Sequence, residues 1–450
     1  MTHGIRVLVL NLRDIANPSA GGAEQHLHSL FRRLAARGHQ VTLYCGGYRG
    51  AGRQETIDGI EIHRRGNRFT TAAWSTIKYL RHRDDFDVIV DYTGQLHFLT
   101  PLYVRQPRVA VALHVVGDVY RNDLPFPTGQ LLAWWETFSL AHFYGKERFI
   151  AISKSTADEL TAHGIQPGQI QLIHCGRHEP IPQPSVPKTS YPSLLYYGRL
   201  KRYKRVDLLL RALAEIRREV PETRLHVVGA GSELESLRRL AKDVGCGDSV
   251  TFHGYLPDAE RWNVVAACWV NVQPSLKEGW GLTVLEAAQC GVPTVASRVA
   301  GLRDAILEGE TGELFERDDT GELIRKVTGL LRNGAQRESL GARAREWSNS
   351  FSWDSASEEL ERLLITATSP NAFGAPDPAE LGHSEIARGA PGAVGGRVDL
   401  IVDHQPQDDH RAQHEYHPAP IEAGSEPAQQ QHHRSGEHID LTEVRRPEPM

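Results

Sequence analysis

Short apolar runs alternate with helical patterns along most of this chain, and this alternation constrains the fold more than any other feature. The first cycle is a strand-like run over residues 5–10, a helical pattern over about 22–37 and a second run over 41–45. Strands joined through helices pair in parallel by right-handed crossovers, and helices cover both faces of such a sheet. The cycle starts again at residue 194. The sequence therefore predicts an α/β protein with two parallel-sheet domains.

A proline-rich segment separates the two repeats. Five prolines lie between residues 178 and 193, and proline stiffens a connection and cannot pair within a sheet. We expect a first domain over residues 1–178, a linker over 179–192 and a second domain over 193–350. The segment 369–450 holds 10 of the 25 prolines and 8 of the 22 histidines, so it is too polar to build a core and predicts a disordered tail.

Charge and cysteine content exclude several classes of protein. The net charge is −5, and residues 369–450, with 14 acidic and 6 basic side chains, contribute −8 of it. The remaining +3 is too small for a nucleic-acid-binding body. The five cysteines are odd in number and far apart, which favours reduced core thiols. With no signal peptide and no apolar run near 18 residues, we expect a cytoplasmic protein that is at most peripheral at a membrane.

Residues 275–297 indicate a loop, a helix, a turn and a buried strand. Glu278 lies in the loop and Glu286 on the helix, while Gly279 and Gly281 let the backbone approach a ligand. A helix start of this kind favours phosphate.

A second candidate anion site lies about eighty residues earlier. Gly198 follows a strand-like run, and Arg199 and Lys204 come directly after it, near the start of another helix. Two anion sites at strand ends, one of them carrying cations, indicate a diphosphate held between them.

The order of these motifs resembles the retaining nucleotide-sugar glycosyltransferases of family 4, which have the GT-B fold. The resemblance rests on Glu278 and Glu286, on the segment Ala287 to Pro293, and on Gly198, Arg199 and Lys204, and it extends over residues 5 to about 367. It implies two Rossmann-like, doubly wound domains facing across a cleft. It also implies that a last helix, 353–367, crosses back onto the first domain, which would be the acceptor side.

The resemblance also implies a role for each site residue. Glu278 would contact hydroxyls of the donor sugar and Glu286 those of the ribose, since an ionised carboxylate accepts two hydrogen bonds from a diol. His114, at a strand end, would contact the donor sugar. The expected catalytic residues are His114, Arg199, Lys204 and Glu278, and the expected donor-binding residues are Gly21, Gly22, Gly198, Arg199, Lys204, Gly279, Trp280, Gly281, Leu282 and Glu286.

Some positions depart from the family or point elsewhere. Ala300, Arg303 and Asp304 replace a glycine, a proline and a glutamate that the family usually shows, which puts the donor contacts of that loop in doubt. The Asp85-Phe-Asp87 segment matches the Asp-x-Asp motif of metal-dependent transferases, but acidic residues before a strand are common. We therefore expect neither a metal nor another cofactor. The apolar helical segment 127–148 is expected to be buried between layers rather than docked on a membrane.

Three functions remain open at this level. The first is a hexosyltransferase that uses GDP-mannose or a UDP-sugar, with a glycan, a lipid-linked molecule or a small molecule as acceptor. The second is a GT-B epimerase or a phosphorylase, the latter of which would need a pyridoxal lysine. The third is a non-catalytic protein that binds sugar nucleotides. A dehydrogenase is disfavoured because Leu234 stands where the third glycine of a dinucleotide fingerprint would follow Gly229 and Gly231.

Overall fold

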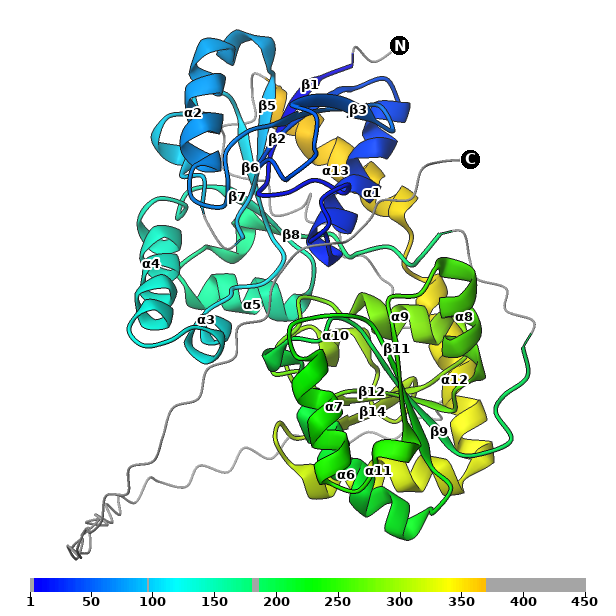
Figure 1. Cartoon of the computed structure of the whole chain (residues 1–450). Coiled ribbons are helices and arrows are strands. Elements are labelled where there is room, and N and C mark those ends of the chain that lie inside the picture. The colour runs from blue at the N-terminus through cyan, green and yellow to red at the C-terminus, as the bar shows by residue number, and fades with distance from the viewer. Residues whose placement is uncertain (1–3, 95–96, 180–185, 370–450) are drawn as a thin grey trace, which may run out of the picture. The chain divides into compact units, whose positions relative to one another are not determined.

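The computed structural model of the chain describes residues 4–94, 97–179 and 186–369 and contains two separate sheets (Figure 1). Residues 180–185 of the expected linker and the expected tail from residue 370 onward lie outside the described residues.

The first sheet has eight strands in the order β3-β4-β2-β1-β5-β6-β7-β8. All of its pairs are parallel except β3 with β4, which form an antiparallel hairpin. Its strands are β1 (Arg6–Leu10), β2 (Gln40–Cys45), β3 (Gln54–Ile57), β4 (Ile60–Arg64), β5 (Val88–Tyr92), β6 (Arg108–Ala112), β7 (Arg148–Ala151) and β8 (Ile170–Leu172).

The second sheet has six strands in the order β11-β10-β9-β12-β13-β14, and all of its pairs are parallel. Its strands are β9 (Ser193–Tyr197), β10 (Arg224–Val228), β11 (Val250–Gly254), β12 (Val270–Gln273), β13 (Thr294–Ser297) and β14 (Gly312–Phe315). The two-sheet α/β architecture predicted from the alternation is confirmed.

Helices connect the strands in both sheets. They are α1 (Gly22–Ala36), α2 (Thr71–Arg81), α3 (Asp118–Asp123), α4 (Thr128–His142), α5 (Lys154–Ala162), α6 (Val206–Glu219), α7 (Leu234–Asp243), α8 (Asp258–Ala267), α9 (Leu282–Gln289), α10 (Leu302–Ala305), α11 (Thr320–Arg332), α12 (Gly334–Asn349) and α13 (Trp353–Thr368). Within the described part of the chain, none of them is long and apolar enough to cross a membrane.

Side chains of β1 show why the first sheet is covered on both faces. Val7 and Val9 point to one face and pack in a core with α1, whereas Leu8 and Leu10 point to the other face and pack with Tyr79 of α2. All four β1 side chains are fully buried, as expected for a central strand of a parallel sheet.

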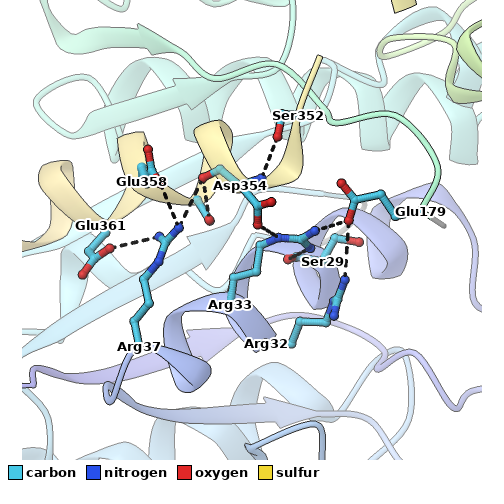
Figure 2. A network of polar contacts seen from close by, with 10 residues as sticks. Ser29, Arg32, Arg33, Arg37, Glu179, Ser352, Asp354, Glu358 and Glu361 are labelled. Carbon is cyan, nitrogen blue, oxygen red and sulfur yellow. Dashed lines mark hydrogen bonds and ion pairs between the residues drawn. The ribbon is translucent and has the colours of Figure 1, made fainter. Parts of the chain in front are cut away.

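The last helix, α13, packs on the first sheet although it follows the second one in sequence. Trp353 and Leu360 lie in the same core as Val7 and Val9. A polar network reinforces this packing (Figure 2).

In this network Arg33 of α1 donates to Asp354 of α13 at 2.6 Å and also pairs with Glu179, and Arg37 donates to Glu361 at 3.0 Å. Arg33 therefore joins both Glu179, the first residue of the expected linker, and the returning helix to α1.

The prediction that segment 127–148 is buried between layers is wrong. Its helix, α4, buries only the face that carries Gly129, Ala133, Glu136, Ser139 and Leu140, while Leu131 and Trp134 are 60% and 59% exposed. A Cβ on Gly129 would lie 2.4 Å from the carbonyl oxygen of Tyr120. The close approach to α3 thus requires glycine at this position, and the large apolar side chains of Leu131 and Trp134 lie on the exposed face.

Candidate functional site

The predicted site residues follow the carboxyl ends of parallel strands in both sheets. His114 lies two residues after β6, Gly198 and Arg199 come directly after β9, and Glu278 follows β12. Ligands of open α/β sheets bind at this edge.

Lys204 and Glu278 are brought together by two neighbouring strands of the second sheet. Lys204 ends a short 3-10 turn, Arg202–Lys204, and its ammonium group contacts Oε1 of Glu278. The hydroxyl of Ser275 donates to the same oxygen at 2.8 Å. The two ionised side chains are 13% and 14% exposed, so the carboxylate is held in one orientation at the edge of solvent.

Gly21 lies against Arg199. A Cβ on Gly21 would be 3.1 Å from a terminal nitrogen of the Arg199 guanidinium, and one on Gly22 would be 3.5 Å from Leu282. The backbone N–H of Gly21 donates to Glu24 at 2.7 Å, which fixes the start of α1. The first glycine loop and the Arg199 cation therefore meet.

Glycines also fix the loop that carries Arg199. Gly229 has φ +137°, and a Cβ there would lie 1.9 Å from the carbonyl oxygen of Gly198. The hydroxyl of Tyr196 donates to the carbonyl oxygen of Arg199 at 2.9 Å. Gly229 therefore packs the next strand-end loop against this one and supports the loop that carries Arg199.

The loop before α9 is held in a narrow space. Gly281 begins the helix with φ +97°, a conformation that suits glycine. A Cβ on Gly279 would lie 2.5 Å from the carbonyl oxygen of Leu113, and one on Gly301 would lie 2.5 Å from that of Glu278. This packing brings Glu278 next to the segment that carries His114.

Burial lowers the pKa of His114 to about 4, and the cation of Lys277 adds to this effect. The opposing effect of the Glu278 carboxylate is smaller. The imidazole is therefore neutral at pH 7, and it can exchange hydrogen bonds with a sugar hydroxyl without carrying charge.

Sequence reasoning missed Lys277, which lies directly before Glu278. Its ammonium group pairs with Glu159 of α5 at 2.7 Å, and the other oxygen of Glu159 accepts from the backbone N–H of Val115 at 3.2 Å. The signal was available, because Lys277 is a cation in the same glycine-flanked loop.

Glu286 is buried on α9, away from Glu278. Burial raises its pKa to about 7, against opposing effects of Arg261 and of the Tyr197 hydroxyl. Nδ1 of His178 lies 3.9 Å from its carboxylate. Sequence reasoning did not assign Tyr197, His178 or Arg261 to the site, because they come from three distant parts of the chain.

Trp280 and Leu282 were predicted to bind the donor, and both pack into the first core. The Trp280 indole is 3% exposed and stacks on His174, with ring centroids 4.6 Å apart, and it meets Phe351 edge-on at 5.1 Å. Leu282 packs at the border of the same core. The Trp280 side chain therefore supports the loop from inside the core.

The residues that depart from the family pattern have partners of their own. Asp304 accepts from the backbone N–H of Ser155 at 2.9 Å, and Nε of Arg303 donates to the hydroxyl of the same serine at 2.8 Å. The backbone N–H of Glu278 donates to Ala300 at 3.3 Å. This loop therefore connects the site to the first turn of α5.

The Asp85-Phe-Asp87 segment lies at the amino end of β5, opposite the site edge. Asp87 pairs with Arg6 at 2.7 Å, and Asp85 pairs with His82 at 3.2 Å. Among residues 4–94, 97–179 and 186–369, no three His, Cys, Asp or Glu side chains are grouped so that they could hold a metal ion.

Two family models match consecutive parts of the chain. Residues 20–179 match the family described as Glycosyltransferase Family 4, and residues 178–347 match the family described as glycosyl transferases group 1.

Individual proteins are similar over different shares of the chain. A GDP-mannose-dependent alpha-(1-6)-phosphatidylinositol monomannoside mannosyltransferase from Mycolicibacterium smegmatis is 35% identical over 38% of this chain and 47% of that protein, about half of its length. D-inositol 3-phosphate glycosyltransferase 2 from Catenulispora acidiphila is 28% identical over 74% of this chain and 87% of that protein. Among solved structures, sucrose-phosphate synthase from Thermosynechococcus elongatus aligns with a TM-score of 0.69 and 23% identity over 81% of this chain and 100% of that one. This last likeness shows the fold.

Proposed function

Because the chain belongs to the family 4 glycosyltransferases and has the GT-B fold, we propose that it transfers a hexosyl unit from a nucleotide sugar to an acceptor and retains the anomeric configuration. The family membership predicted from the motifs is confirmed. We propose the identity of the donor, the identity of the acceptor and the retention of configuration.

One observation carries the proposal: one cation of the second domain meets the glycine loop of the first, and a second cation from the same strand-end loop holds a carboxylate. Arg199 lies against Gly21, and Lys204 is paired with Glu278. The pairing holds the carboxylate ready for the hydroxyls of a sugar. A binding protein would not require this whole set, which favours catalysis over simple recognition.

The chemistry follows from where charge develops. As the bond from the anomeric carbon to the diphosphate breaks, the sugar becomes oxocarbenium-like and the leaving diphosphate gains negative charge. Arg199, Lys204 and the backbone N–H groups at the start of α9 are fixed donors that stabilise this charge. The acceptor oxygen attacks the same face that the diphosphate leaves, and its proton passes to the leaving phosphate. This front-face displacement needs no side-chain nucleophile.

The remaining residues orient the donor. The neutral imidazole of His114 and the carboxylate of Glu278 bind sugar hydroxyls, and Glu286 binds the ribose diol. The cations take the charge-neutralising role that a metal ion has in other transferases, so we propose a reaction that needs no metal and no other cofactor.

The names of the relatives narrow the substrates to be tested first. The Mycolicibacterium relative is named for GDP-mannose and for phosphatidylinositol monomannoside, and the Catenulispora relative for D-inositol 3-phosphate. We propose GDP-mannose as the first donor to test, followed by UDP-sugars, with a small-molecule or lipid-linked acceptor.

The test is hydrolysis of each donor by the purified protein without an acceptor, followed by transfer to candidate acceptors. NMR of the transfer product shows whether the anomeric configuration is retained. The variant Glu278→Gln is the control for contaminating hydrolases, because it should lose turnover. The proposal is wrong if the protein neither hydrolyses a donor nor binds a nucleoside diphosphate.

A further inference from the structure

Four exposed arginines gather on the loops that follow β2 and β4. They are Arg49 and Arg53 in the first loop and Arg65 and Arg68 in the second. Backbone hydrogen bonds join the two loops: Gly47 donates to Gly66 at 3.0 Å and Arg64 donates to Arg53 at 2.8 Å. We call these four residues the arginine shelf.

Local carboxylates do not neutralise the shelf. Segments 11–20, 46–55 and 64–70 contain six arginines and two acids, Asp14 and Glu55. Both acids bind Arg64: Asp14 is fully buried against it, with contacts of 2.8 and 3.0 Å, and Glu55 contacts another of its nitrogens at 2.5 Å. The sixth arginine, Arg13, pairs with Glu24 at 2.9 Å.

None of the four shelf arginines takes part in an ion pair with another described residue. Arg68 contacts the ring of Phe69, itself 72% exposed, with the guanidinium carbon 4.6 Å from the ring centroid. The shelf is therefore a surface of uncompensated positive charge beside an exposed aromatic ring.

The loop between β1 and Gly21 connects the region of the shelf to Arg199. Asp14 belongs to the loop that connects β1 to Gly21, and Arg64 holds that loop against β4. Gly46 also donates to Leu12 of this loop at 3.0 Å. At the other end of the loop, Gly21 meets Arg199. A molecule on the shelf would therefore contact the part of the first domain that holds one end of this loop, while the other end of the loop meets Arg199.

We propose that the arginine shelf binds a phosphate group of the acceptor. Guanidinium groups recognise phosphate by paired, charge-assisted hydrogen bonds, and a neutral glycan would leave all four charges without a partner. This inference rests on the proposed transferase function. A phosphate ester of a small polyol and the headgroup of a phospholipid share the required chemistry, and the experiment distinguishes them.

The experiment compares two double variants of the full chain. Arg65→Gln with Arg68→Gln removes two charges from the shelf. The matched control, Arg211→Gln with Arg239→Gln, removes two exposed charges of the second domain that have no ion-pair partner among the described residues. Each protein is titrated calorimetrically with inositol 3-phosphate and with inositol, and it is sedimented with phosphatidylcholine vesicles with and without phosphatidylinositol. Donor hydrolysis without an acceptor is measured in parallel.

The expected result is that the wild type and the control bind a phosphate-bearing probe, and that the shelf variant binds it at least about tenfold more weakly. Binding of inositol 3-phosphate identifies a soluble acceptor, and binding of phosphatidylinositol vesicles alone identifies a lipid acceptor. Equal binding by the shelf variant and the control, or no binding of either probe by the wild type, overturns the inference. Donor hydrolysis should be the same in all three proteins, and its absence in the wild type would count against the proposed function, not against the shelf.

Discussion

The ammonium group of Lys204 contacts the carboxylate of Glu278, and this pair joins the loop after β9 to the loop after β12. The strands are neighbours in the second sheet, so the pair forms where two strand ends meet. Because Ser275 donates to the same carboxylate oxygen, Glu278 is oriented before any ligand arrives. Preorganisation of this kind lowers the reorganisation needed in the transition state.

Substitution of Glu278 and substitution of Glu286 should change different kinetic constants. Glu278→Gln acts on the reacting sugar, so turnover should fall by about a hundredfold or more while the donor still binds. Glu286→Gln weakens a charge-assisted hydrogen bond to ribose, an effect of about 1.5–3 kcal/mol, and should mainly raise the donor Michaelis constant.

Calorimetric titration with a free nucleoside diphosphate separates the two roles, because that ligand has the ribose but lacks the sugar. The assignment is reversed if Glu278→Gln loses affinity for the nucleoside diphosphate and Glu286→Gln keeps it.

Donor binding should depend on pH because of Glu286. Burial raises the pKa of this carboxyl to about 7, so its charged form, the better acceptor for a diol, forms as the pH rises through that value. The affinity for a nucleoside diphosphate should therefore increase between about pH 6 and pH 8. Glu286→Gln should abolish this increase, and an unchanged profile in that variant would assign the titration to another group.

The same ionisation should affect stability with the opposite sign. Since the pKa is raised from its ordinary value of 4.5, the protonated form favours the folded state. The contribution of this group is fully present below about pH 4.5 and is lost as the pH rises through about 7. Urea unfolding of the wild type and of Glu286→Gln at several pH values measures the difference.

Activity should survive EDTA, because Arg199, Lys204 and the start of α9 supply the positive charge that a metal would otherwise provide. The check is the donor hydrolysis rate before and after chelation, with added Mg²⁺ and Mn²⁺ in separate samples. A strict metal requirement of the chemical step would instead indicate that Asp85 and Asp87 bind a metal. Those residues would then have to leave their present partners, His82 and Arg6.

Features with a local cause could be read from the sequence. Helix α5 has such a cause, because serine favours helix starts and the side chain of Ser153 accepts from the backbone N–H of Thr156. The β3–β4 hairpin also had a local signal, since Asp58 and Gly59 form its turn with φ +48° and +81°. An Asp-Gly pair between strand-like runs predicts such a turn, but the sequence interpretation did not use it.

Features that depend on distant contacts could not be read in this way. The close approach of Gly129 in α4 to the carbonyl oxygen of Tyr120 is such a contact, and hydrophobicity alone does not reveal it. Trp280 stands in the motif that was predicted to bind the donor. Its indole nevertheless packs with His174, which follows β8, and with Phe351, which precedes α13. The environment of Glu286 likewise combines distant residues: Tyr197 at the end of β9, Arg261 of α8 and His178, the residue before the expected linker.

Arg64→Met should destabilise the first domain strongly. The Arg64 and Asp14 side chains are 1% and 0% exposed and form two contacts, at 2.8 and 3.0 Å. Burial alone would raise the pKa of Asp14, but Arg64 holds it below its usual range. Removal of the arginine leaves a buried carboxylate without its partner, which costs about 3–5 kcal/mol.

The matched control is Arg53→Met, which changes an exposed arginine of the same region that has no ion-pair partner among the described residues. It should alter the free energy of unfolding by less than about 0.5 kcal/mol. The double variant Asp14→Asn with Arg64→Met should recover part of the loss, because no buried charge then remains unpaired. Urea unfolding of all three variants at neutral pH is the measurement. A loss for Arg64→Met as small as that for Arg53→Met would show that the pair does not hold the loop between β1 and Gly21 in place.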